Sequence, residues 1–171
     1  RNGKWLETVI FAPMIIPDIV LAISLLSFFS LLGVKMGLHT IIVSHVVFNL
    51  AFVCAVVRAR LKSFDWSIID ASSDLGASMF ITLYRVVIPV LIPAILAGGL
   101  LAFTLSVDEF IIAFFTSGAG RASITLPMQI FAMIRFGVTP EINALATIVM
   151  SVSVIALALS QRLNKGGLPG Q

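Results

Sequence analysis

Residues 65–93 read DWSIIDASSDLGASMFITLYRVVIPVLIP and form the only long segment with many polar residues in an otherwise strongly apolar chain. Acidic residues cluster in its first half, Gly76 divides it, and its apolar second half reaches Pro89. Apolar spans alone would hold a helical protein in a bilayer. We therefore interpret this insert as a part of the protein that contacts something outside the membrane.

The composition excludes an ordinary soluble fold. Hydrophobic residues make up 59% of the 171 residues and charged residues only 11%, whereas soluble domains contain about 25% charged residues. A soluble fold of this length could not cover so much apolar surface, so the solvent must be lipid. The net charge of +3 comes from residues at the ends of apolar runs, which indicates control of topology rather than nucleic-acid binding. The lone Cys54 is interpreted as a small buried residue, because it has no disulfide partner in the chain.

Four apolar runs are each long enough to cross a bilayer, since a helical span needs about 20 residues. We expect a single domain over residues 1–171, with spans at about residues 6–32, 38–58, 88–115 and 141–162. Pro13 and Pro17 predict a kink in the first span. The triplet Thr139-Pro140-Glu141 predicts the start of the last helix, and residues 127–136 predict a short interfacial helix. The fold class is therefore an all-α, polytopic membrane helical bundle.

His45 and Asn49 lie four residues apart within the second run. The interpretation we favour is hydrogen bonding between helices, which is common for polar groups in membrane bundles. His39 is the only other histidine, so the sequence predicts no metal site and no cofactor. An intramembrane enzyme is a rival class, but the chain has no His-Glu-x-x-His or Gly-x-Gly-Asp motif.

Basic residues predict the orientation. With four spans, the N-terminus, the insert and the C-terminus all lie on one side of the membrane. Eight basic residues belong to that side: Arg1, Lys4, Arg58, Arg60, Lys62, Arg85, Arg162 and Lys165. The other side has three: Lys35, Arg121 and Arg135. The positive-inside rule then places the insert and the C-terminus in the cytoplasm.

The insert itself, residues 63–88, predicts two short helices with a bend between them. Residues 64–75 form an amphipathic pattern in which Asp70 and Asp74 share one face. Gly76 suits the left-handed residue that ends a helix. Ser78 is expected to cap the second helix, whose apolar ridge consists of Met79, Phe80, Leu83 and Tyr84.

These residues resemble the EAA loop of binding-protein-dependent ABC importer permeases. That loop has the pattern Glu-Ala-Ala, three residues, Gly, nine residues, Ile, one residue, Leu-Pro. In this chain Asp70-Ala71-Ser72, Gly76 and Pro89 are in register with it, with Val86 and Ile88 in place of Ile and Leu. Within the family, four stretches look most like the second permease subunit of spermidine/putrescine importers. They are residues 17–20, 64–65, 106–109 and 137–147.

The resemblance implies a bacterial inner-membrane subunit of six helices, of which the first two would precede this chain. It also implies a second permease subunit, a dimer of a cytoplasmic ABC ATPase, an extracytoplasmic solute-binding protein, and a small solute as substrate. ATP hydrolysis would belong to the ATPase, because this chain has no phosphate-binding Gly-x-x-x-x-Gly-Lys-Ser/Thr loop. The residues that would couple to the ATPase are Asp70, Ala71, Ser72, Asp74, Gly76, Met79, Phe80, Leu83 and Pro89.

Asp18, Asp108 and Glu109 are acidic residues inside apolar runs. An ionised acid at the bilayer centre costs about 2.5–3.5 kcal/mol on insertion scales, so such residues usually face a water-filled path or a partner. Our hypothesis is that they attract a linear polycation through the pore. The alternative is a structural role, in which they pair with Arg121, Arg135 or a neighbouring helix.

Polyamine is the first choice of substrate, and acids along the path argue against an anion. Iron, sulphate or another organic cation remain alternatives for the same permease role. A channel or a membrane scaffold would explain the acids but not the register of Asp70, Gly76 and Pro89.

Overall fold

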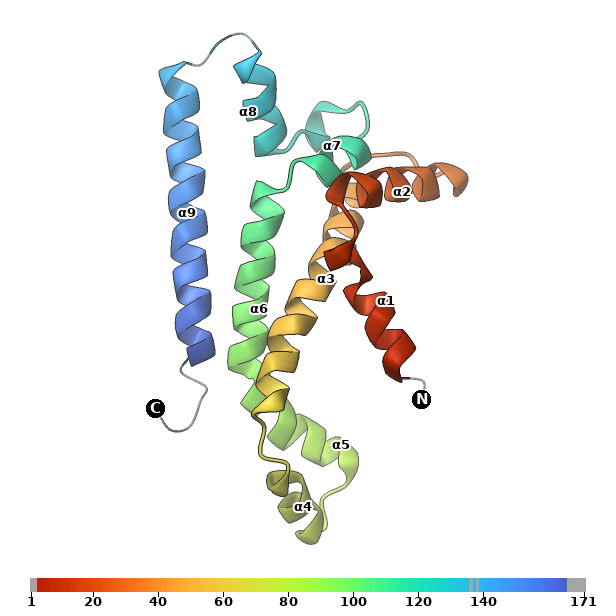
Figure 1. The fold of residues 1–171 in the computed structure, drawn as a ribbon, viewed down its shortest axis with the longest axis vertical. Helices are drawn as coiled ribbons and strands as arrows, with labels where there is room; N and C mark the ends of the chain where they lie inside the picture. Colours follow the sequence, from red (N-terminus) through yellow and green to blue (C-terminus); the bar gives the residue numbers. More distant parts are fainter. Residues whose placement is uncertain (1–2, 136, 138, 166–171) are drawn as a thin grey trace.

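The computed structural model describes residues 3–135, 137 and 139–165, and it contains helices and loops but no strand in that part of the chain. The helices are named as in Figure 1. They are α1 (Gly3–Ile15), α2 (Asp18–Leu31), α3 (Leu38–Lys62), α4 (Ser67–Asp74), α5 (Met79–Thr82), a π-helical turn η1 (Leu83–Val87), α6 (Ile88–Asp108), α7 (Ile111–Thr116), a 3-10 turn η2 (Arg121–Ser123), α8 (Leu126–Ile134) and α9 (Pro140–Lys165). The predicted all-α helical bundle is confirmed.

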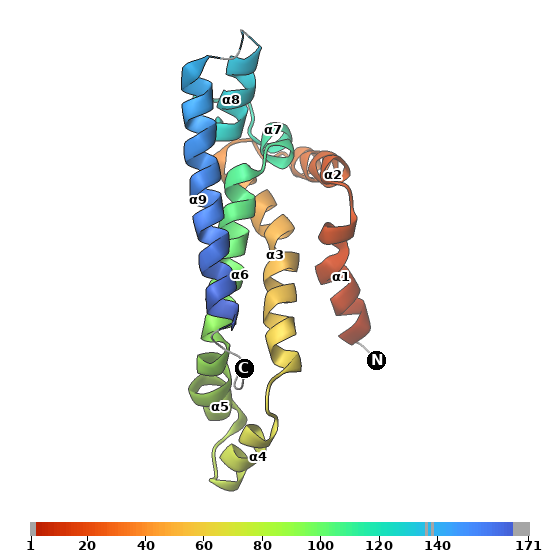
Figure 2. The same cartoon turned by 60° about the vertical axis from the view of Figure 1, so that its left-hand side comes forward.

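Three helical segments are long and apolar enough to cross a membrane: Leu38–Lys62, Met79–Asp108 and Pro140–Arg162. The corresponding helices α3, α6 and α9 form the body of the molecule, with α6 packed between the other two (Figures 1 and 2). Small and polar side chains join them. The Ser160 hydroxyl of α9 donates to the Ala97 carbonyl of α6 at 2.7 Å, and small residues at helix contacts are typical of membrane bundles.

The first apolar run, expected as one span over residues 6–32, is not one continuous helix. It forms α1 and α2, which meet at an angle of 111°, so that α2 lies across one end of the bundle (Figure 1). Because proline disfavours helical geometry in the residue before it, α1 ends at Ile15 and a new helix begins after Pro17. Pro13 stays inside α1. The predicted kink is thus a sharp turn at the second proline.

The expected third span over residues 88–115 is also interrupted. Helix α6 ends at Asp108, and Glu109 has an extended backbone with a ψ of 115°. The Glu109 carboxylate accepts a hydrogen bond from the Ile112 amide at 2.7 Å, which satisfies a free amide in the first turn of α7. The chain therefore starts a second, short helix instead of continuing α6. Helix α7 then packs against α2 around a core of Leu21, Ala22, Phe48 and Ile112.

Candidate functional site: the α4–α5 loop and the acidic residues

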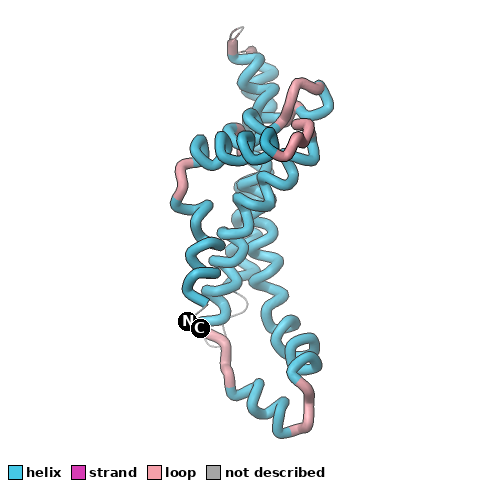
Figure 3. The backbone as a smooth tube through the Cα atoms, turned by 90° about the vertical axis from the view of Figure 1, so that its right-hand side faces the viewer, coloured by secondary structure: helices cyan, strands magenta, loops and turns pink. Residues whose placement is uncertain are grey.

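Helices α4 and α5 extend beyond one end of the bundle. It is the end at which α1 begins and α9 finishes (Figures 1 and 3). Gly76 ends α4 in the left-handed conformation, with a φ of +79°. The Ala77 amide donates to the Ser72 carbonyl at 3.1 Å and the Gly76 amide donates to the Ser73 carbonyl at 2.9 Å. This pair of bonds is a Schellman motif. The predicted left-handed helix end at Gly76 is confirmed.

Helix α4 is shorter than the pattern over residues 64–75 predicts, because it begins at Ser67. The Asp65 carboxylate accepts a hydrogen bond from the Ser67 amide at 3.0 Å and so closes a turn ahead of the helix. Hydrogen bonds from the Ser67 side chain and backbone lower the pKa of Asp65. Phe64 is buried against Trp66, with the two ring centroids 5.3 Å apart. These contacts fix the direction in which the chain leaves α3.

A hydrogen bond joins the two short helices. The hydroxyl groups of Ser72 on α4 and Thr82 on α5 lie 2.9 Å apart, and Thr82 is buried. Ser72 thus has a hydrogen-bond partner on the other side of the bend. The sequence patterns did not single out that partner, Thr82. Ser78 does occupy the position before α5, but its side chain makes no capping hydrogen bond. Its carbonyl instead accepts from the Thr82 amide at 2.9 Å.

The junction between α5 and α6 is a π-helical turn over Leu83–Val87. Proline cannot donate to the residue four positions earlier, and its ring collides with that carbonyl in an α-helix. The wider turn, in which the Ile88 amide donates to the Leu83 carbonyl, makes room for Pro89 at the start of α6. The chain changes direction there, since α5 lies at an angle to α6 (Figure 1).

The apolar ridge of α5 is solvent-facing. Met79 is 87% exposed and Phe80 is 78% exposed, and Leu75, Leu83 and Tyr84 are exposed beside them. Asp70, Ala71 and Asp74 are exposed as well. An apolar patch at the protruding end of a molecule marks an interaction surface rather than a core.

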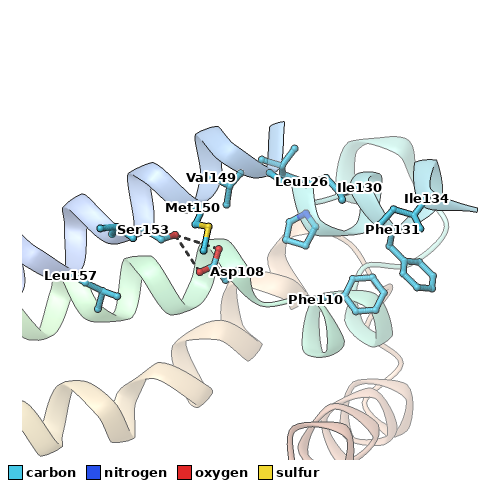
Figure 4. Close-up of a pocket in the computed structure, with 13 residues that line it drawn as sticks. Asp108, Phe110, Leu126, Ile130, Phe131, Ile134, Val149, Met150, Ser153 and Leu157 are labelled. Atoms are coloured by element: carbon cyan, nitrogen blue, oxygen red, sulfur yellow. Dashed lines mark hydrogen bonds between the residues drawn. The ribbon is translucent and has the colours of Figure 1, made fainter. Parts of the chain in front are cut away.

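The acidic residues occupy two different places. Asp108 is the last residue of α6, at the end of this helix away from the α4–α5 loop. It accepts hydrogen bonds from the Ser153 hydroxyl of α9 at 3.2 and 3.4 Å. Both residues line a cavity of about 450 Å³ between α6, α8 and α9, whose other walls are apolar and include Phe110 and Phe131 (Figure 4).

Glu109 and Asp18 lie on the α2–α7 side instead. Glu109 holds the start of α7 through its bond to Ile112, and Asp18 is the first residue of α2. The structure therefore places Asp18 and Glu109 in the region where α2 packs against α7, and Asp108 in a separate cavity.

A comparison with protein families decides the classification. Residues 2–165 match the model of the binding-protein-dependent transport system inner membrane component. The chain belongs to this family. The family membership that the Asp70–Pro89 segment predicts is thereby confirmed.

Individual members of this permease family are similar over nearly the whole chain. The spermidine/putrescine transport system permease protein PotC of Escherichia coli (strain K12) is 40% identical over 170 residues, covering 99% of this chain and 64% of PotC. The putrescine transport system permease protein PotI of the same strain is 42% identical over 175 residues, covering 96% of this chain and 62% of PotI. PotC of Haemophilus influenzae is 39% identical over 165 residues, covering 96% and 63%. The chain thus spans less than two thirds of the length of these relatives.

The structural alternative for these acids is pairing with Arg121, Arg135 or a neighbouring helix. Within the described ranges the one ion pair joins Arg58 of α3 to Glu7 of α1. The Arg135 guanidinium lies over the Phe131 ring, 6.0 Å from its centroid. The partner of Asp108 is therefore Ser153 on a neighbouring helix, not an arginine.

His45 makes the predicted contact between helices, since its Nδ1 lies 2.7 Å from the Ser106 hydroxyl of α6. Asn49 does not, because its amide group donates to the His45 carbonyl of its own helix at 2.9 Å. No group of three or more His, Cys, Asp or Glu residues suited to a metal ion occurs in the part of the chain that the structure describes.

Proposed function

We propose that the full-length protein is a membrane-spanning permease subunit of an ABC importer and that it forms part of the translocation path for a small solute. The observation that supports this most directly is the α4–α5 loop, which projects from the bundle with the exposed ridge of Met79 and Phe80. An amphipathic helix with such a ridge suits insertion into an apolar groove, and membership of the permease family indicates that the groove belongs to an ATPase.

The proposed complex contains this subunit, a second permease subunit, two copies of a cytoplasmic ABC ATPase, an extracytoplasmic solute-binding protein and surrounding lipid. The permease itself would not hydrolyse ATP. The loop and the C-terminus would lie in the cytoplasm of a bacterial cell and the bundle in its inner membrane. The excess of basic residues on that side, eight against three when counted from the sequence, supports this orientation.

We propose a polyamine as the solute, spermidine or putrescine. The similar permeases named above transport these compounds according to their names. The chemistry of the Asp108 cavity also suits a polyamine, because a carboxylate attracts an ammonium group and the rings of Phe110 and Phe131 accept methylene chains and cations. Iron, sulphate or another organic cation stays an alternative.

The test is reconstitution of the complete transporter in liposomes, with ATP-dependent uptake of labelled spermidine, putrescine, sulphate and iron as the readout. The wild-type complex should co-purify with an ATPase and import the polyamines. Phe80→Asp should reduce both uptake and solute-stimulated ATP hydrolysis at least ten-fold, because a carboxylate in an apolar groove loses its hydration.

Phe80→Leu is the matched control, since it keeps an apolar side chain on the ridge and should retain most of the coupling. Wild-type uptake and hydrolysis by Phe80→Asp would contradict the proposed docking of the loop. Import of sulphate or iron in place of polyamines would leave the permease role standing and overturn the substrate.

A further inference from the structure

A second cleft, distinct from the Asp108 cavity, lies between α3 and α6. Its volume is about 490 Å³, and Thr125, just before α8, is one of its lining residues. Its polar lining residues are His45 and Asn49 from α3, Ser106 from α6, and Thr125. The exposed side chains Ile42, Val46 and Phe103 belong to its apolar lining.

Three buried polar atoms in this cleft have no hydrogen-bond partner among the described residues. They are His45 Nε2, Asn49 Oδ1 and Thr125 Oγ1. His45 is 8% exposed and Asn49 is 7% exposed, so both side chains are more than nine-tenths buried. Buried polar groups in proteins are nearly always paired, and three unpaired atoms in one cleft indicate a ligand that supplies the missing bonds.

The donor and acceptor roles of these three atoms indicate which hydrogen-bonding groups a ligand must supply. The Asn49 amide nitrogen already donates to the His45 carbonyl, which leaves its oxygen as an acceptor only. Thr125 Oγ1 can accept from any donor. His45 Nε2 accepts when the proton is on Nδ1, the nitrogen that contacts Ser106. An acceptor-only anion cannot satisfy Asn49, whereas an ammonium group has several donors and no acceptor.

We infer that the α3–α6 cleft is a binding subsite for an ammonium group of the transported amine, with Asn49 Oδ1 as its principal acceptor and His45 and Thr125 as further acceptors. This inference rests on the proposed function, and it assigns recognition of the amine to uncharged side chains as well as to the acidic ones. A linear polyamine suits the cleft because its donors alternate with methylene segments, which match the apolar walls. Ile42 and Phe103 of the apolar lining are exposed, and exposed side chains rotate within nanoseconds, so the lining can adjust to admit an amine.

The test uses the full-length permease in the complete reconstituted transporter, with KM and kcat for spermidine uptake measured separately. Asn49→Leu removes the acceptor oxygen, and Asn49→Asp keeps an acceptor oxygen. Both variants lose the donation to the His45 carbonyl, so any structural effect of that bond is common to the two. We expect Asn49→Leu to raise KM about ten-fold with little change in kcat, and Asn49→Asp to keep KM at or below the wild-type value.

Thr125→Val, which removes only a hydroxyl, should raise KM by a smaller factor. Equal KM values for Asn49→Leu and wild type, or equal losses in Asn49→Leu and Asn49→Asp, would overturn the inference. Loss of the second permease subunit from purified Asn49→Leu complexes would overturn it as well, because the missing donor would then be a lysine or other group of that subunit. Absence of amine uptake by the wild-type complex would refute the proposed polyamine substrate and the subsite with it, whereas wild-type uptake with an unaffected Asn49→Leu variant would refute the subsite alone.

Discussion

Gly76 controls the direction of the chain between α4 and α5. Its φ of +79° lies in a region that costs other residues about 1–2 kcal/mol. A Cβ atom at this position would meet nothing within 4 Å. The cost of a substitution is therefore backbone strain alone, without a steric clash, and it acts on the bend that orients the exposed ridge of α5.

We predict that Gly76→Val abolishes solute uptake and leaves membrane insertion intact, because a β-branched residue strongly disfavours positive φ. Gly76→Asn is the control, since asparagine tolerates the left-handed conformation, and it should retain most of the uptake. Transport in vesicles and the amount of protein in the membrane fraction would be measured together. Wild-type uptake by Gly76→Val would mean that the bend is not needed for coupling.

At the scale of the elements, the close packing of α3 and α6 depends on Gly98. A Cβ atom there would lie 3.3 Å from Val53 Cγ1 and 3.4 Å from Val53 Cα. The latter atom belongs to the backbone and cannot rotate away. Gly99, the next residue of the same helix, would meet nothing within 4 Å. A substitution at Gly98 therefore tests the contact between α3 and α6, whereas the same substitution at Gly99 tests helix propensity.

We predict that Gly98→Leu destabilises the permease by about 1–3 kcal/mol, the usual cost of overpacking a well-packed contact. Gly99→Leu should not destabilise it, because leucine is the better helix former and its Cβ would meet nothing within 4 Å at this residue, which lines the α3–α6 cleft. Thermal unfolding of the purified transporter in detergent would compare the two variants. An equal loss of stability in both would show that α3 and α6 do not meet at Gly98 in the assembled protein.

At the scale of the whole molecule, the intramembrane acids divide between two environments. Glu109 and Asp18 lie where α2 crosses α7, and Glu109 is occupied in holding the first turn of α7. Asp108 lies in the cavity between α6, α8 and α9, where its one described partner is the neutral Ser153 hydroxyl. Asp108 therefore has no basic partner within the described chain, which makes it the strongest of the three candidates for contact with a cationic solute.

We predict that Asp108→Asn raises the KM for polyamine uptake about ten-fold, equivalent to ~1.4 kcal/mol, while the complex assembles normally. The amide keeps the shape of the side chain and an oxygen that can accept from Ser153, so the change tests the charge. Glu141→Gln removes a charge near the start of α9, outside the residues that line the cavity, and should have no effect. Unchanged affinity and rate for Asp108→Asn in a well-expressed complex would remove Asp108 from the transport path.

The sequence by itself determined the membrane class, the helical fold and the position of the α4–α5 loop. These features depend on composition and on local spacing. Gly76 predicted the left-handed helix end, because glycine adopts positive φ without strain. The interval from Gly76 to Pro89 predicted the family, and proline likewise imposes its own backbone geometry. The predicted contact of His45 with another helix was also correct, although its partner Ser106 was not foreseen.

Only the tertiary structure decided the 111° turn after α1, the end of α6 at Asp108 and the partners of the buried polar groups. Proline shows where a helix is disturbed but not by what angle, which depends on what the next helix packs against. Ser153 lies 45 residues from Asp108, and Thr125 lies far along the chain from Asn49, so no periodicity connects them. Such pairings follow from how whole helices pack, and a local pattern does not contain that information.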